Sequence, residues 1–106
     1  MTPAQLPIAV VYTIRLQIEF DPAKNDRNIR ERGLSFERAA DFDFETAVVF
    51  SEERHGELRR VAVGYLDGRL HVLCYIPAAE GIRVISFRKA NLREAHRYGK
   101  PKTIDQ

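Results

Sequence analysis

The chain has a single cysteine and lacks the short motifs that build common cofactor sites. Cys74 lies within the apolar run "HVLCYI" of the 106-residue sequence. One cysteine excludes a disulfide framework and fits a reducing compartment, and its apolar neighbours predict a buried thiol. The sequence contains no CxxC pair, no HExxH motif and no glycine-rich phosphate loop. We therefore expect no cofactor and no metal site.

Long hydrophobic runs are also absent. In the N-terminal segment "MTPAQLPIAVVYTIRLQIEF" the apolar patch covers only about six to nine residues, whereas a membrane-spanning helix needs ~20. No basic residue precedes the patch, and Pro7 stands before it, which argues against a signal peptide. We predict a cytoplasmic protein without membrane contact, in which residues 1–14 form an additional strand or an N-terminal extension.

The composition is that of a soluble globular protein. Hydrophobic residues make up 44% of the chain and charged residues 30%, which is too apolar for a disordered chain. No repeat, linker or low-complexity tract interrupts the sequence. Its length suits one domain, which we predict to cover residues 1–106.

Positive charge is concentrated at the C-terminal end. Residues 1–82 carry ten Lys/Arg against thirteen Asp/Glu, whereas residues 83–102 carry seven Lys/Arg against Glu94 alone. A basic segment of this kind suits a polyanion or an acidic protein partner. The alternative is a surface that serves only solubility.

The segment "DPAKNDRNIRERG" has the signals of a short helix. Asp21 can cap its start, Pro22 suits the first helical position, and Gly33 suits the left-handed turn at its end. The alternating residues 15–20 before it predict a strand. Ser35 is the next N-cap, and it predicts a second helix over about residues 36–42 whose inward positions are Phe36, Ala39 and Ala40.

The rest of the chain predicts four strands and a last helix. "FETAVVFSEE" is interpreted as a strand that ends in acidic loop residues, and residues 57–76 as a hairpin around Asp67 and Gly68. A turn at "AAEG" leads to the strand "IRVISF". Asn91 and Glu94 have the spacing of a capping box that starts a helix. The order β-α-α-β-β-β-β-α predicts an α+β fold, an antiparallel sheet with helices on one side.

Three segments resemble BrnT-type toxins. "FDPAKNDRNIRERGLSFERA" resembles the opening of these proteins, "LRRVAVG" a central strand, and "RVISFRKANLREAHRY" their close. The resemblance implies a RelE-like fold and a ribonuclease toxin of a type II toxin–antitoxin pair. It also implies an RNA substrate and a cognate antitoxin whose ribbon-helix-helix domain binds DNA, so that operator DNA is contacted only through the antitoxin.

The chain departs from the family pattern at four positions. Arg32 stands where the family has histidine, and the other departures are Ala78, Phe87 and Ala95. They leave open a second interpretation, in which the protein is a non-catalytic binding module with the same fold that serves as antitoxin partner and co-repressor.

Metal-independent RNA cleavage defines which residues to look for. It needs a base for the 2′-hydroxyl proton, positive groups for the charge that develops on the phosphate, and an acid for the leaving oxygen. Arginine suits the second task, because its charged planar fork matches two phosphate oxygens. The resemblance places family-matching arginines at Arg59, Arg83 and Arg88, on or beside neighbouring strands. These three and Glu94 are the predicted catalytic residues. The alternatives are surface ion pairs for the arginines and simple capping for Glu94.

The first helix carries a polar stripe in place of an apolar one. Lys24, Asn28 and Arg32 follow one another at four-residue spacing, so they share one face. We expect Asn28 to make a buried hydrogen bond that locks the helix to the sheet. Lys24 and Arg32 would then line one wall of a basic groove and bind RNA.

The C-terminal segment is expected to form the other wall of this groove. Its basic residues are Lys89, Arg93 and Arg97. We predict that Lys89 and Arg93 bind RNA. We also predict that Arg93 and Arg97 bind the antitoxin, whose acidic side chains would neutralise this surface.

Overall fold

The computed structural model describes residues 16–104 of the chain. The elements are, in order, β1 (Gln17–Glu19), α1 (Pro22–Arg32), the 3₁₀-helix η2 (Phe36–Asp41), β2 (Val48–Arg54), β3 (Glu57–Leu66), β4 (Arg69–Ala78), β5 (Gly81–Lys89) and α2 (Leu92–Arg97). This order confirms the predicted sequence of strands and helices. The predicted extension, residues 1–14, lies outside the described residues.

The five strands form one mixed sheet in the order β1-β5-β4-β3-β2. Strands β2 to β5 are antiparallel neighbours, whereas β1 pairs with β5 in parallel. The prediction of an antiparallel sheet was therefore wrong for β1. Alternation of polar and apolar residues looks the same in both kinds of pairing, so it does not encode the direction of a neighbour.

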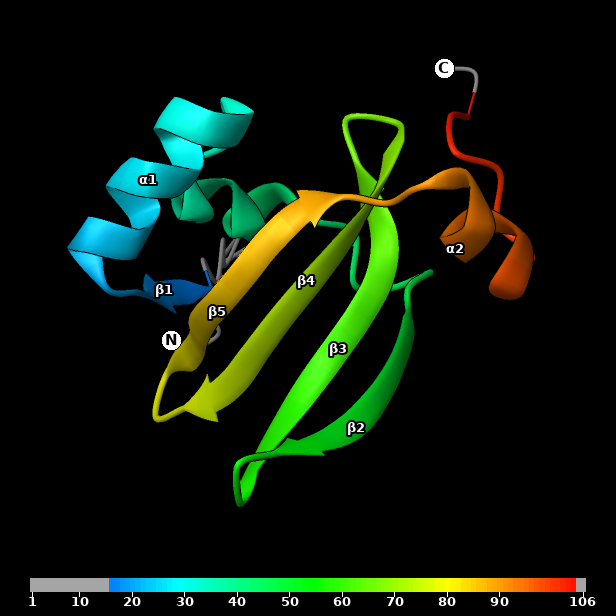
Figure 1. The fold of residues 1–106 in the computed structure, drawn as a ribbon. Helices are drawn as coiled ribbons and strands as arrows, with labels where there is room; N and C mark the ends of the chain where they lie inside the picture. Colours follow the sequence, from blue (N-terminus) through cyan, green and yellow to red (C-terminus); the bar gives the residue numbers. More distant parts are fainter. Residues whose placement is uncertain (1–15, 105–106) are drawn as a thin grey trace, which may run out of the picture.

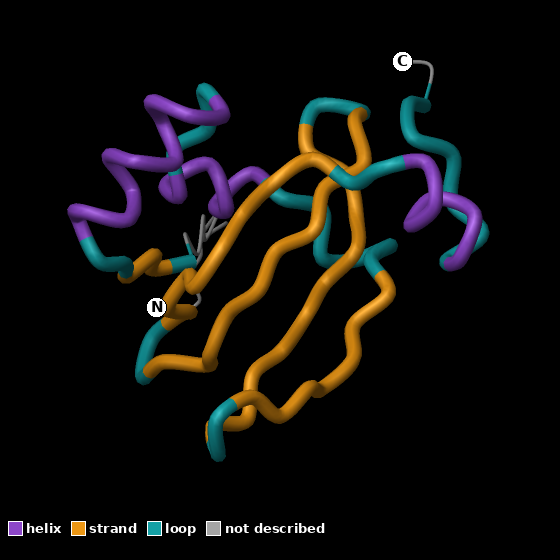
Figure 2. The backbone as a smooth tube through the Cα atoms, viewed as in Figure 1, coloured by secondary structure: helices purple, strands orange, loops and turns teal. Residues whose placement is uncertain are grey.

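Tight turns join the long strands, as Figure 2 shows for the segment from β2 to β5. Asp67 and Gly68 form the predicted turn between β3 and β4, both with positive φ. His55 and Gly56 form the turn between β2 and β3 in the same way. Strand β2 extends to Arg54, so its acidic residues lie in the strand and not in a loop as predicted.

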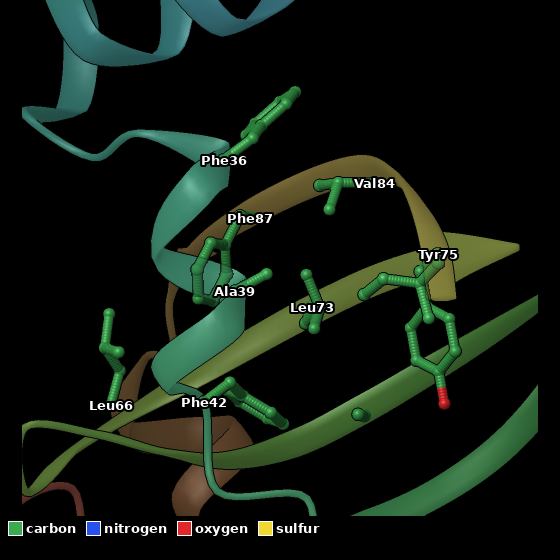
Figure 3. Packing of buried hydrophobic residues seen from close by; sticks show 10 residues of the cluster. Phe36, Ala39, Phe42, Leu66, Leu73, Tyr75, Val84 and Phe87 are labelled. Carbon is green, nitrogen blue, oxygen red and sulfur yellow. The ribbon is translucent and has the colours of Figure 1, made fainter. Parts of the chain in front are cut away.

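The helices α1 and η2 lie by one face of the sheet. Ala39 of η2 and Phe42, which caps the end of η2, point towards Leu73 and Phe87 of the sheet (Figure 3), and all four belong to one buried cluster. Ala40 was predicted to face inward, but it is exposed. The reason is the geometry of η2, because a 3₁₀-helix has three residues per turn and places Phe36, Ala39 and Phe42 on one side.

The helix α2 packs on the opposite face of the sheet. Its buried residue Ala95 belongs to a second cluster with Val61, Val63 and Val72, and Figure 1 shows the chain crossing from β5 to α2 at the other side of the sheet from α1. The prediction that all helices lie on one side was wrong. The six residues of α2 are too few for an apolar stripe that would reveal which face they cover.

Helix α1 is attached to the sheet through amides. Its caps are those predicted, Asp21 at the start and Gly33 with φ 66° at the end. Asn28 is only 5% exposed and donates from Nδ2 to the carbonyl oxygens of Leu34 at 2.9 Å and Phe87 at 3.0 Å. The predicted locking role of Asn28 is therefore confirmed. Within the described part of the chain, no helix is long and apolar enough to cross a membrane.

Candidate active site

The face of the sheet that carries α2 is hollowed into a cavity of about 370 Å³. Small or apolar side chains form its floor, among them Val61 and Cys74. Its charged lining consists of four arginines and two glutamates: Arg54, Arg59, Arg88, Arg97, Glu52 and Glu94. An open, net positive cavity over a rigid sheet suits a phosphate-bearing ligand.

Arg88 and Glu94 form a two-pronged ion pair at this cavity. Nη1 of Arg88 donates to Oε1 of Glu94 at 2.9 Å, and Nη2 donates to Oε2 at 2.7 Å. Strand β5 supplies the arginine and α2 the glutamate, and both side chains are held by further contacts. The pair therefore fixes the direction of the Arg88 guanidinium towards the cavity.

Glu94 also caps its own helix. The Asn91 side chain accepts from the Glu94 backbone N–H at 2.8 Å, and the Glu94 carboxylate accepts from the Asn91 N–H at 3.0 Å. This is the predicted capping box. The hydrogen bonds from Arg88, above all, lower the pKa of Glu94 from 4.5 to about 2. A carboxylate this acidic is a weak proton acceptor at neutral pH.

Arg59 reaches the cavity from β3, and Cys74 forms part of the floor beneath. Burial raises the pKa of the Cys74 thiol, an effect that the nearby charge of Arg59 partly opposes. The prediction of a buried cysteine is confirmed. The thiol therefore stays protonated and serves as floor rather than as a nucleophile.

Arg83 is not among the residues that line this cavity. It lies at the β1 end of β5 and faces Glu19 at 4.0 Å, with both side chains about half exposed. The structure thus brings together three of the four predicted catalytic residues, Arg59, Arg88 and Glu94. The interpretation of Arg83 as a surface ion pair fits its position.

The polar stripe of α1, Lys24, Asn28 and Arg32, lies beside β5 on the side of the sheet opposite to α2. Lys24 and Arg32 line a second cavity of about 270 Å³ together with Ser86, which also lines the first cavity. Lys89 and Arg32 line a third cavity that includes Arg88. The three cavities share, in pairs, the lining residues Arg32, Ser86 and Arg88 around β5, and the groove that would join them stays a prediction.

The C-terminal wall of the groove is partly as predicted. Arg97 lines the sheet-face cavity and helps to lower the pKa of Glu94. Arg93 is exposed on α2 but is not among the residues that line that cavity. It is thus available on the surface, whereas Arg97 belongs to the site itself.

Comparison with known proteins identifies the family. A sequence model described as "Ribonuclease toxin, BrnT, of type II toxin-antitoxin system" matches residues 20–94, which is more than half of the chain. The chain belongs to the BrnT family of ribonuclease toxins. Inhibition of translation and neutralisation by a cognate antitoxin follow from that family.

A solved BrnT structure supports the assignment. The crystal structure of the Brucella abortus ribonuclease toxin BrnT shares 28% sequence identity with this chain at a TM-score of 0.58, and the match covers 72% of this chain and 97% of that one. No curated protein matches the sequence. The α+β fold is confirmed by this likeness, while the wider RelE-like relationship stays a prediction.

Two features of this BrnT-family site were missed from the sequence. Glu52 of β2 lines the cavity, although its segment had been interpreted as a loop. Phe50 and Tyr98 stack at its rim with ring centroids 5.8 Å apart. The alternation Phe50, Glu52, Arg54 along an extended strand was the signal that places all three on one face.

His71 of β4 lines the third cavity together with Arg32 and Arg88. It is buried, its ring lies 5.4 Å from that of Phe87, and its Nδ1 lies 2.7 Å from the Arg69 carbonyl oxygen. The carbonyl can only accept, so Nδ1 carries the proton. Burial lowers the pKa of His71, which keeps the ring neutral at pH 7.

Proposed function

We propose that this protein is a metal-independent endoribonuclease whose site is the sheet-face cavity. The observation that carries the proposal is that Arg59 and the Arg88–Glu94 ion pair lie at one cavity. The substrate is RNA, cleaved in the cytoplasm by attack of a 2′-hydroxyl on the neighbouring phosphate. We also propose that residues 1–106 form a single domain, as the chain length predicts.

The arginines stabilise the charge that develops on the phosphate. Guanidinium groups remain protonated at any physiological pH and present paired donors that match two phosphate oxygens. Arg88 is held in place by Glu94 before RNA arrives, so little reorganisation is needed during the reaction. Glu94 is thus a positioning residue, and it was predicted as a catalytic one.

The same guanidinium charges support a mechanism without a metal. A metal ion in a nuclease neutralises phosphate charge, and four arginines already surround this cavity. Lys24, Arg32 and Lys89 extend the positive surface around β5 and bind the RNA backbone on either side of the cleaved bond. Their contribution is to affinity and not to the chemical step.

The partner that neutralises the toxin is an antitoxin with a ribbon-helix-helix domain, through which operator DNA is contacted. Arg93 and Arg97 of α2 bind its acidic side chains. Because Arg97 also lines the cavity, an antitoxin that covers α2 blocks RNA at the same time. This double use of one surface explains inhibition without a conformational change.

The test of metal independence is an assay of the purified protein on total RNA in excess EDTA. We expect cleavage in EDTA at the same rate as with magnesium. Activity that disappears in EDTA and returns with magnesium would contradict the proposal. Absence of cleavage under both conditions would favour the non-catalytic binding module, whose only role is to bind the antitoxin.

Arg59→Ala and Arg88→Ala should each lower the cleavage rate by about 10²-fold or more, the scale for losing one charge partner of the transition state. Arg60→Ala is the matched control, because Arg60 is the exposed neighbour of Arg59 on the other face of β3. Arg83→Ala should behave like this control. A rate for Arg83→Ala as low as that for Arg88→Ala would return Arg83 to the site.

A further inference from the structure

The sheet-face cavity holds two carboxylates, and they differ in how far they are engaged. Glu94 receives two hydrogen bonds from Arg88 and one from the Asn91 backbone, and its pKa falls to about 2. Glu52 has a single long ion pair, with 3.9 Å between its Oε2 and Nη1 of Arg54. Glu52 is therefore the carboxylate of this cavity that is free to accept a proton.

The position of Glu52 suits a reaction at the arginines. It stands directly opposite Arg59 in the β2–β3 register, so the two side chains are cross-strand neighbours on one face. Its side chain is 35% exposed, which leaves it accessible to a ligand in the cavity. A phosphate held by Arg59 thus lies beside the carboxylate.

We propose that Glu52 is the general base that takes the proton from the attacking 2′-hydroxyl of the RNA. The proposal rests on the proposed ribonuclease function and names the residue that this function still lacks. Glu52 is not among the catalytic residues predicted from the sequence.

The proposed step is balanced in atoms and charge. The 2′-hydroxyl proton moves to the Glu52 carboxylate while the 2′-oxygen forms a bond to phosphorus. The bond from phosphorus to the 5′-oxygen breaks, and that oxygen takes a proton from water at the open side of the cavity. The products are a 2′,3′-cyclic phosphate and a 5′-hydroxyl end, and Glu52 then returns its proton to solvent.

The surroundings of Glu52 decide which pH dependence to expect. The charged or titratable groups that share the cavity with it come from the sheet and from the C-terminal segment: Arg54, Arg59, Cys74, Arg88, Glu94, Arg97 and Tyr98. Hydrogen bonds from Arg88 lower the pKa of Glu94 to about 2, and burial raises the pKa of Cys74. The pH profile of Glu52→Gln, compared with that of the wild type, is therefore the readout that separates loss of a base from loss of a structural contact.

The test compares Glu52→Gln with Glu53→Gln, which makes the same chemical change on the next residue, at the opposite face of β2. We measure single-turnover cleavage against pH with an RNA oligonucleotide that the wild type cleaves in EDTA. Binding is measured with the same oligonucleotide carrying a 2′-deoxy residue at the cleavage site. Circular dichroism and thermal unfolding check that both variants fold.

Glu52→Gln should cleave at least about 10²-fold more slowly, the range for loss of a general base, and its pH profile should differ from that of the wild type. Its affinity for the 2′-deoxy oligonucleotide should be unchanged or higher. Glu52→Asp, which keeps a carboxylate, should recover part of the rate, and Glu53→Gln should match the wild type. A wild-type rate and pH profile for Glu52→Gln would overturn the assignment.

A substrate with sulfur in place of the 5′-oxygen separates the base from an acid. Sulfur leaves without needing a proton, so it rescues a variant that lacks the acid but not one that lacks the base. Full rescue of Glu52→Gln by this substrate would overturn the proposal. Failure of the wild type itself to cleave RNA in EDTA would instead overturn the proposed function on which the assignment rests.

Discussion

At the scale of single residues, the Asn28 side chain connects helix α1 to strand β5. At this contact it binds Phe87 and Leu34 and also accepts from Arg32 at 2.8 Å. Strand β1 pairs only with residues 81–83 of β5, so the Phe87 carbonyl lies beyond the reach of that strand. The Asn28 amide takes the place of a missing strand, and it also anchors the Arg32 side chain.

Asn28→Ala should lower the free energy of unfolding by about 2–4 kcal/mol, because it leaves two carbonyl oxygens without their donor at roughly 1–3 kcal/mol each. Urea unfolding followed by circular dichroism measures this loss. Asp26→Ala is the control on the same helix, since Asp26 is exposed, and its effect should stay within about 0.5 kcal/mol. Equal stabilities of the two variants would show that α1 is held by other contacts.

At the scale of elements, α2 is too short to be stable by itself. Six residues form fewer than two turns, and isolated helices of this length do not persist in water. The capping box and the Arg88–Glu94 pair supply what its length does not, together with the burial of Ala95. The stability of α2 and the orientation of the Arg88 guanidinium therefore depend on the same carboxylate.

The Glu94 carboxylate should make the free energy of unfolding depend on pH in the acidic range. Its pKa in the folded protein is about 2 against an ordinary 4.5, and its side chain is 19% exposed. A depression of this size corresponds to about 3 kcal/mol. Because the pKa is lower in the folded protein, the ionised carboxylate contributes its full stabilisation at pH values above the pKa of the unfolded chain. This contribution is lost as the pH falls from about 4.5 towards 2.

Glu94→Gln should therefore be less stable than the wild type at pH 7, and the difference should shrink as the pH approaches 2. Urea unfolding of both proteins at a series of pH values gives this comparison. Glu37→Gln in the first turn of η2 is a suitable control, because the residue is exposed. A difference that stays constant from pH 7 to pH 2 would mean that the ion pair does not contribute as proposed.

At the scale of the whole molecule, charge is distributed unevenly along the chain and in space. The basic segment 83–102 includes most of β5 and all of α2, which border the sheet-face cavity. In the proposed function, such a field attracts the RNA substrate and an acidic antitoxin alike, and it speeds their encounter at low salt. Competition between the two partners for α2 is the expected consequence.

The association rate of the antitoxin should fall between about 50 and 500 mM salt, where the screening length decreases from roughly 14 to 4 Å. Arg93→Glu combined with Arg97→Glu should slow association at low salt and make it much less dependent on salt. Arg27→Glu combined with Arg30→Glu is the control, with the same charge change on the exposed side of α1. Stopped-flow measurements that give equal rates for the two double variants would place the antitoxin elsewhere.

The sequence by itself determined the elements and their caps. Asp21, Gly33, Asn91 and the Asp67–Gly68 turn act through contacts within a few residues, so local patterns reveal them. The resemblance to the BrnT family, and not local pattern, pointed to Arg59, Arg83 and Arg88. Local pattern thus gave most of the fold, while the candidate site residues came from the resemblance.

Only the tertiary structure decided how distant segments meet. The direction of β1 and the face that α2 covers depend on packing between residues far apart in the chain. The tertiary structure also decides which of the two cavity carboxylates, Glu52 or Glu94, is held by an arginine. Both are carboxylates in the sequence, but a guanidinium from another element holds one of them, and nothing within a few residues of either one encodes that contact.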